Sequence, residues 1–185
     1  MKLILITLLL TSCAIEQSKP IPMEVGNGEQ SSQFYDYCLY NSTLYQCGFE
    51  YPQINNYKGE AKTFYLNSES FEVLDDMNSH VNYNVKYKAD DFQGLWNDAR
   101  DSWRGDCEDY ALAKMLALIE LGVPQEAMGI ALVDTDNDGK SNHAVLVVNT
   151  DKGAYVLDNR SDWVKPYTMM DGAFIHVPDY LKGTI

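Results

Sequence analysis

The 185-residue chain is poor in positive charge. It has 14 lysines and arginines against 27 aspartates and glutamates, which gives a formal net charge of −13. No basic stripe is visible, and a surface that binds nucleic-acid phosphates needs one, so we exclude nucleic acid as a partner. An acidic surface suits a protein that meets divalent cations, although a need for solubility explains the same charge.

The N-terminus has no apolar run long enough to cross a bilayer. It reads MKLILITLLLTSC, with Lys2 before a short apolar stretch, and this pattern is typical of an export signal. Residues 10–13 resemble a bacterial lipobox, in which the cysteine is lipidated; a plain secretory signal is the alternative. We predict a signal peptide over residues 1–12 and a lipid on Cys13. The protein is then expected on the periplasmic side of the envelope, and Ala14, which is not an aspartate, favours the outer membrane.

Cysteine is also scarce, with four in the chain. If Cys13 carries a lipid, three remain for an oxidising compartment. Cys38 and Cys47 flank LYNSTLYQ, a loop rich in turn-forming residues, so we expect a disulfide between them. Cys107 is then left unpaired. A lone thiol in an exported protein is either well buried or kept for its chemistry.

The composition changes three times along the chain, and no internal repeat is visible. Residues 13–33 are polar with Pro and Gly and predict a flexible tether. Residues 34–66 form a tyrosine-rich segment that contains the predicted disulfide. Its tyrosines fit either packing over the disulfide loop, which we favour, or a platform for sugars or peptides. Residues 67–185 are predicted to form the main domain.

Helical periodicity dominates the first half of that domain and strand patterns the second. Helices are expected over 68–85, with Ser68 or Ser70 as the cap, around 91–103, and over 106–121. The last is apolar almost all round, which is typical of a buried helix. Strands are expected over 129–135, 143–150 and 153–160, the last two joined as a hairpin. Helices followed by consecutive strands predict an α+β fold in which a buried helix packs on an antiparallel sheet.

The stretch GDCEDYALAK puts Cys107 in the first turn of the buried helix. The helix dipole and unpaired N–H groups there stabilise a thiolate, which still needs a base. His143 opens a predicted strand. If residues 151–152 form a two-residue loop, His143 and Asp158 lie diagonally on one face of the hairpin. The three residues then form a Cys-His-Asp set suited to nucleophilic catalysis, whereas an inert buried cysteine is the alternative.

These motifs resemble a known family. GDCEDYALAKMLALIELGVP, followed by HAVLVV and YVLDNR, is similar to the bacterial transglutaminase-like cysteine proteinases, the family of the LapG-type periplasmic proteases. The resemblance covers residues 79–163. It implies a papain-like, transglutaminase-type fold, with Cys107 as the nucleophile, His143 as the base and Asp158 as its orienting carboxylate. It also implies limited cleavage of envelope or surface proteins such as adhesins. The segment after Trp96 lacks the proline usual in the family, which leaves the wall of the substrate cleft undefined.

The resemblance further implies a calcium requirement. Acidic residues beside the cysteine serve as ligands in the family, and the matching positions are Asp106 and Glu108, with Asp109 as a third candidate. A bound dication would favour the thiolate, whereas the alternative is that these acids only complement the helix dipole. A second acidic run, DTDNDG at 134–139, begins like an EF-hand loop but has Val145 where that pattern requires Glu. We interpret it as a turn, with weak calcium binding as the alternative.

The sequence therefore predicts a lipid-anchored, calcium-dependent cysteine endopeptidase of the bacterial envelope with a protein substrate. Two alternatives stay open. The same triad supports a transglutaminase or an amidase that acts on cell-wall peptides, because these differ only in the acceptor or the substrate. A non-catalytic envelope lipoprotein that binds a partner is the alternative from another class.

Overall fold

The structure is a computed structural model and describes residues 34, 37–39, 44–50, 62–89 and 96–182. The predicted signal peptide, Cys13 and the tether lie outside these residues and remain predictions. Within the described part of the chain, no helix combines the length and the apolar character that a membrane span requires.

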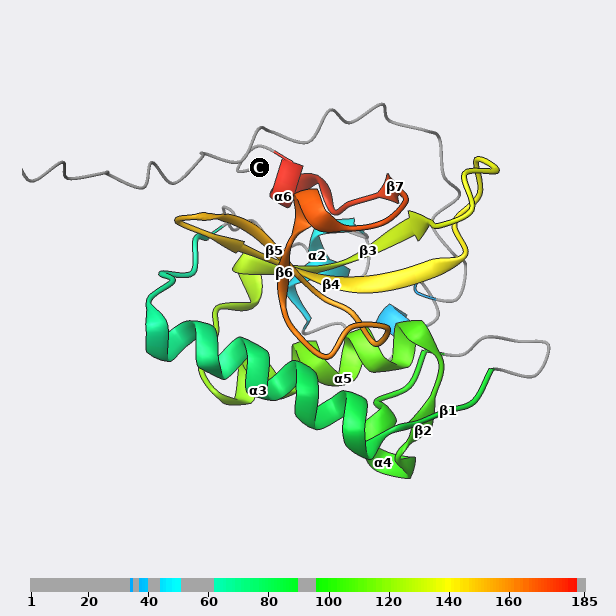
Figure 1. Ribbon diagram of the computed structural model, residues 1–185, viewed down its shortest axis with the longest axis horizontal. Helices are drawn as coiled ribbons and strands as arrows, with labels where there is room; N and C mark the ends of the chain where they lie inside the picture. Colours follow the sequence, from blue (N-terminus) through cyan, green and yellow to red (C-terminus); the bar gives the residue numbers. More distant parts are fainter. Residues whose placement is uncertain (1–33, 35–36, 40–43, 51–61, 90–95, 183–185) are drawn as a thin grey trace, which may run out of the picture.

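A five-stranded antiparallel sheet forms the centre of the fold (Figure 1). Its order is β6-β5-β4-β3-β7, with every neighbouring pair antiparallel. The strands span Met128–Asp134 (β3), His143–Thr150 (β4), Gly153–Leu157 (β5), Lys165–Pro166 (β6) and Ala173–His176 (β7). Every residue of β4 is buried, because the sheet is covered on both faces. The predicted α+β arrangement is confirmed.

Two helices cover one face of the sheet (Figure 1). Helix α5, Cys107–Glu120, packs on β4 and β3, and α3, Ser68–Asn84, packs on α5. The expected cap of α3 was wrong by one to three residues. Asn67 is the N-cap, since its side chain accepts the N–H of Ser70 while Ser70 Oγ accepts the N–H of Asn67. This reciprocal pair is a capping box with an uncommon partner.

The opposite face packs against α6, Asp179–Lys182, and against Tyr45, the first residue of α2, Tyr45–Glu50. The rings of Tyr45 and Tyr180 meet edge to face at 4.7 Å between centroids. Cys38 and Cys47 are joined by a disulfide with a Cα–Cα separation of 5.3 Å, and both are fully buried. They belong to the core cluster that also contains Leu112 and Met115 of α5. This part of the tyrosine-rich segment is therefore built into the core of the main domain.

The region before α5 is less helical than expected. Only Ala99–Ser102 forms a helix, α4, which Asp98 caps and Trp103 ends with a φ of 54°. Residues 96–98 are not helical, and 91–95 lie outside the described residues. Two short parallel strands, β1 (Lys86–Tyr87) and β2 (Arg104–Gly105), then lead into α5. The 3-10 helices η1 (Gln125–Ala127) and η2 (Tyr167–Met169) complete the described elements.

Candidate active site

Cys107 lies in the first turn of α5, as the sequence predicts, and is its first residue, because the helix begins one residue later than expected. It is the free cysteine of the described residues. The thiol is half-buried and donates to Glu108 Oε2 at 3.0 Å. A backbone hydrogen bond from Ala144, the second residue of β4, also reaches it. The start of the buried helix and the start of the central strand therefore meet at this sulfur.

His143 and Asp158 are brought together by the hairpin register. Thr150 pairs with Gly153 across a two-residue loop, and the pairing continues to Leu146 opposite Leu157. Asp158 follows Leu157 directly, and its Oδ1 lies 2.8 Å from His143 Nε2. Both side chains are almost fully buried. The predicted diagonal contact is present, and the two-residue loop on which it depended is confirmed.

The hydrogen bonds of Asp158 determine which nitrogen of His143 carries a proton. Burial alone would raise the pKa of Asp158. Hydrogen bonds from His143 and the Arg160 N–H, with Lys165 nearby, outweigh it and hold the pKa below its ordinary value. An ionised carboxylate can only accept, so Nε2 of His143 is the protonated nitrogen. Its Nδ1 is buried and has no hydrogen-bond partner within the described residues, which leaves a lone pair available for a proton.

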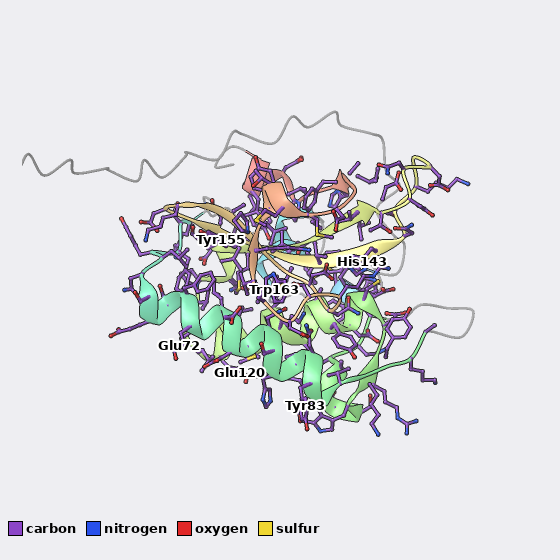
Figure 2. The ribbon with its side chains drawn as sticks, viewed as in Figure 1. Glu72, Tyr83, Glu120, His143, Tyr155 and Trp163 are labelled. Carbon is purple, nitrogen blue, oxygen red and sulfur yellow. A yellow bond between two sulfur atoms is a disulfide. The ribbon has the colours of Figure 1, made fainter. Side chains whose placement is uncertain are left out.

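Cys107 and His143 line one cavity of about 320 Å³. In Figure 2 the label of His143, the first residue of β4, lies on that strand above α5. The sequence did not predict the rest of the wall, which comes from four segments: Tyr87, Trp96, Leu132, Ser141, Asn142 and Ala144. Trp96 supplies the wall of the substrate cleft that was undefined in the sequence. The Asn142 side chain is held by hydrogen bonds to Asp136 and Thr135. Among these residues, only Ser141, Asn142 and Ala144 lie next to His143 in the sequence, and this is the one signal that could have placed them in the site.

Two of the three predicted calcium ligands, Asp106 and Glu108, line the same cavity. They add to the effect of burial on the acidity of the thiol. Burial is the main cause that raises the pKa of Cys107 to about 12. The charge of Glu108, the hydrogen bond of the thiol to Glu108 and the charge of Asp106 raise it further, whereas the backbone hydrogen bond from Ala144 lowers it. In this electrostatic environment the thiol stays protonated at neutral pH. The two carboxylates offer the hard oxygen atoms that calcium prefers, so they fit the implied cation.

Asp109 does not fit that role. Its carboxylate accepts the N–H of Asn97 at 2.6 Å and lies against the backbone of Gly105, where an added Cβ would approach Asp109 Cβ to 2.5 Å. The side chain is buried and is absent from the cavity wall. The Asp109 carboxylate anchors Asn97, the residue next to Trp96, so the geometry argues against Asp109 as a calcium ligand. Helix geometry signals this, since each residue turns by about 100° and Asp109 therefore points away from Cys107.

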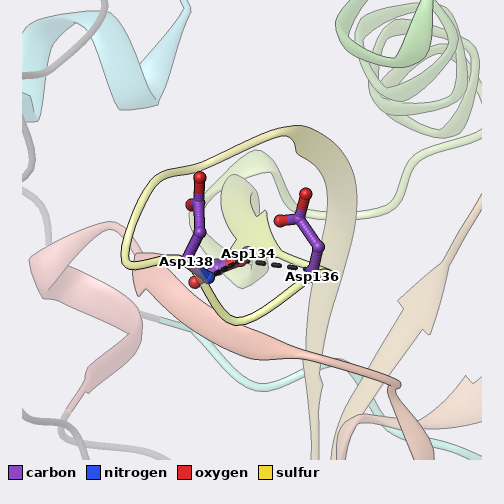
Figure 3. A group of neighbouring side chains, drawn as sticks. All are labelled: Asp134, Asp136 and Asp138. Carbon is purple, nitrogen blue, oxygen red and sulfur yellow. Dashed lines mark hydrogen bonds between the residues drawn. The ribbon is translucent and has the colours of Figure 1, made fainter.

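The second acidic run forms the turn between β3 and β4, as we interpreted it. Asp134 accepts backbone N–H groups from residues 136–139. Figure 3 shows the bonds from Asp136 and Asp138. One carboxylate oxygen each of Asp134, Asp136 and Asp138 lies within 4.8 Å of the others. Among the described residues this is where three acidic groups converge, but both oxygens of Asp134 are engaged by the turn itself.

Comparison with known proteins places these residues in a family. The sequence model of the bacterial transglutaminase-like cysteine proteinases matches residues 25–180. The chain belongs to this family. The match is wider than the resemblance at residues 79–163 and includes the disulfide segment. Family membership and the observed arrangement together confirm the predicted fold class.

Solved structures similar to this chain include LapG from Legionella pneumophila in three forms. The calcium-bound form is 22% identical with a TM-score of 0.45, over 55% of this chain and 61% of that protein. A second LapG structure is 26% identical with a TM-score of 0.41, over 50% and 55%. The EGTA-treated form is 24% identical with a TM-score of 0.42, over 52% and 55%. The chain thus spans less than two thirds of these relatives. A search of curated proteins found no match.

Proposed function

We propose that the protein is a calcium-dependent cysteine endopeptidase of the bacterial envelope that cleaves envelope or surface proteins such as adhesins. One observation carries the proposal. His143 is held through Nε2 by the buried carboxylate of Asp158, while its Nδ1 has no hydrogen-bond partner within the described residues and the residue shares a cavity with Cys107. A family of cysteine proteinases is the expected context for such a pair.

Each residue has a chemical role in peptide hydrolysis. His143 Nδ1 takes the thiol proton, and Cys107 Sγ attacks the peptide carbonyl carbon. The C–N bond breaks, the imidazolium returns the proton to the leaving amine, and a water molecule hydrolyses the thioester. Asp158 fixes the tautomer and stabilises the imidazolium. Because Cys107 is the first residue of α5, its N–H has no partner within the helix and is available to the oxyanion.

Calcium enters the proposal through Asp106 and Glu108, which lie on either side of Cys107 and line the cavity. A bound dication would neutralise these carboxylates and favour the thiolate. Calcium is the ion present in one of the LapG structures. Without a cation, Glu108 accepts a hydrogen bond from the thiol of Cys107, which keeps the thiol protonated and unreactive.

The place of action is also a proposal. The lipobox-like residues 10–13 support a protein anchored by lipid on Cys13 to the periplasmic side of the envelope, in the outer membrane. Replacing Cys13→Ser should move the protein from the membrane fraction to the soluble periplasmic fraction. Retention in the membrane fraction would refute the lipid anchor and leave the proposed activity untouched.

The activity is tested with wild type, Cys107→Ala and His143→Ala incubated with bacterial envelope proteins in calcium. We expect shortened chains with wild type alone, and none in the presence of EGTA. Incorporation of a labelled amine without chain cleavage would identify a transglutaminase instead. Release of peptides from cell-wall material alone would identify an amidase. If none of these reactions occurs, the protein is a binding lipoprotein.

A further inference from the structure

Helix α5 carries a second polar residue that faces inward, Lys114. It interrupts the apolar sequence of the helix, yet its side chain is fully buried. Lys114 lies seven residues after Cys107, so both residues are on the same side of the helix. Lysine is almost never fully buried without a partner, so its surroundings call for an explanation beyond packing.

The partner of Lys114 is an amide on the neighbouring helix. Its Nζ donates to Oδ1 of Asn78 at 2.8 Å, and Asn78 is itself fully buried on α3. The Tyr110 ring lies 6.0 Å from the same nitrogen. The amide of Asn78 therefore has its oxygen fixed by the lysine, which directs its NH₂ group to the other side.

That NH₂ group donates to the loop that carries the orienting carboxylate. Asn78 Nδ2 lies 2.8 Å from the carbonyl oxygen of Ser161. One turn along α3, Asn82 Nδ2 donates to the carbonyls of Asp158 and Ser161 at 3.0 and 2.9 Å. The Ser161 N–H in turn donates to the Asp158 carbonyl at 3.3 Å. In Figure 1 the chain after β5 runs from the sheet toward α3 and α5.

We propose that Lys114 is a positioning residue of the candidate active site, which acts through Asn78 to fix the 158–161 turn and so the carboxylate that orients His143. This inference rests on the proposed function and adds to it a buried polar link between the helix of the nucleophile and the turn of the orienting carboxylate.

Electrostatics agree with this geometry. Burial lowers the pKa of Lys114 to about 7, and the charge of Asp158 opposes this effect. Lys114 thus interacts electrostatically with the carboxylate that it positions. A lysine with a solely structural role would not need to lie where it senses the charge of Asp158. Burying an amine here is costly unless the amine is hydrogen-bonded.

The primary variant is Lys114→Met, which keeps the length of the side chain and removes the donor. The measurement is the proton resonance of His143 Nε2–H in histidine-labelled protein, assigned with His143→Ala. We expect the resonance to shift or to be lost through faster exchange. We also expect kcat for protein cleavage to fall by about 10- to 100-fold with KM nearly unchanged, because a carboxylate displaced by about 1 Å misorients the base.

A second variant covers the case in which Lys114→Met does not fold. Asn78→Asp keeps an acceptor for Lys114 and replaces the donor to Ser161 with an oxygen. We expect the same change of the resonance. Leu118→Ala is the matched control, since Leu118 is fully buried on the same helix. It should lower the melting temperature and leave the resonance in place.

An unchanged His143 resonance in both Lys114→Met and Asn78→Asp would overturn the proposal. The same change in Leu118→Ala would also overturn it, by showing that any loss of core packing suffices. The resonance does not depend on a substrate. A protein in which it responds as expected but which cuts no peptide would refute the proposed function and leave the positioning role intact.

Discussion

Two acidic clusters in the described part of the chain look alike in sequence and differ in structure. One surrounds Cys107, with Asp106 and Glu108 in the wall of the cavity. The other is the turn after β3, where Asp134, Asp136 and Asp138 converge and two of them are exposed. At the first cluster burial raises the pKa of a thiol, and the two carboxylates raise it further. At the second, they accept backbone N–H groups and close a turn.

The difference shows that clustering of carboxylates by itself does not identify a functional cation site. The turn brings three carboxylates together, yet its own backbone already satisfies Asp134. The pair at Cys107 leaves the thiol in its unreactive form, and a cation would relieve that state. The proposed calcium therefore fits the pair at Cys107 better than the turn, and the variants below separate the two clusters.

The largest effect is expected from Glu108→Gln on the labelling of Cys107 by iodoacetamide at pH 8. In wild type, calcium should speed labelling by at least about 100-fold over EGTA, because the thiolate fraction rises as the pKa falls from its raised value. Glu108→Gln removes a negative charge that raises this pKa. In EGTA, Cys107 of the Glu108→Gln variant should therefore be labelled roughly tenfold faster than Cys107 of wild type. In calcium it should be labelled more slowly than wild type, so the effect of the substitution on the labelling rate changes sign.

The matched control is Asp136→Asn in the other cluster, which should keep the full response of wild type to calcium. The assignment is contradicted if Asp136→Asn abolishes the response while Glu108→Gln retains it. The functional cation would then bind at the turn. A thiol that labels rapidly in EGTA would instead remove the need for any cation.

A smaller effect is expected from Asp109→Ala, which tests a residue that belongs to the first cluster in sequence only. Its carboxylate holds the N–H of Asn97 beside Trp96 of the cavity wall. Losing a hydrogen bond to a charged group should raise KM for protein cleavage by about tenfold and leave the calcium response of labelling unchanged. Asp109→Asn, which keeps an acceptor, should restore most of the loss. A lost calcium response in both variants would make Asp109 a ligand after all.

Asp109 and Asp158 illustrate what the sequence can predict about this site. The contact between His143 and Asp158 followed from counting residues around a two-residue loop, since strand pairing fixes which side chains meet. The inward turn of Asp109 was accessible from helix geometry, but its partner was not. Asn97, like the Asn78 that binds Lys114, comes from another element, and no local pattern encodes which elements pack together.

The smallest effect on the site is expected from Asp134→Asn, which should instead change stability. Hydrogen bonds from the backbone of Gly139, Asn137 and Asp138 outweigh the effect of burial and hold the pKa of Asp134 below its ordinary value. A lowered folded-state pKa contributes stability that is present above the unfolded-state value, about 3.9 for aspartate. That contribution is lost as the pH falls through the folded-state value.

At pH 7, Asp134→Asn should therefore lower the melting temperature by about 3–6 °C, as the loss of a helix cap does. The difference from wild type should shrink as the pH falls below about 4, because the carboxyl of the unfolded wild-type chain is then protonated and that of the folded protein follows at lower pH. Thermal unfolding between pH 3 and 7 measures this difference in melting temperature. The calcium response of iodoacetamide labelling at Cys107 is the parallel readout. A constant difference across this range would show that the charge of Asp134 does not support the turn. A loss of calcium response without destabilisation would transfer the functional cation to this cluster, because the carboxylate would then serve the ion and not the backbone.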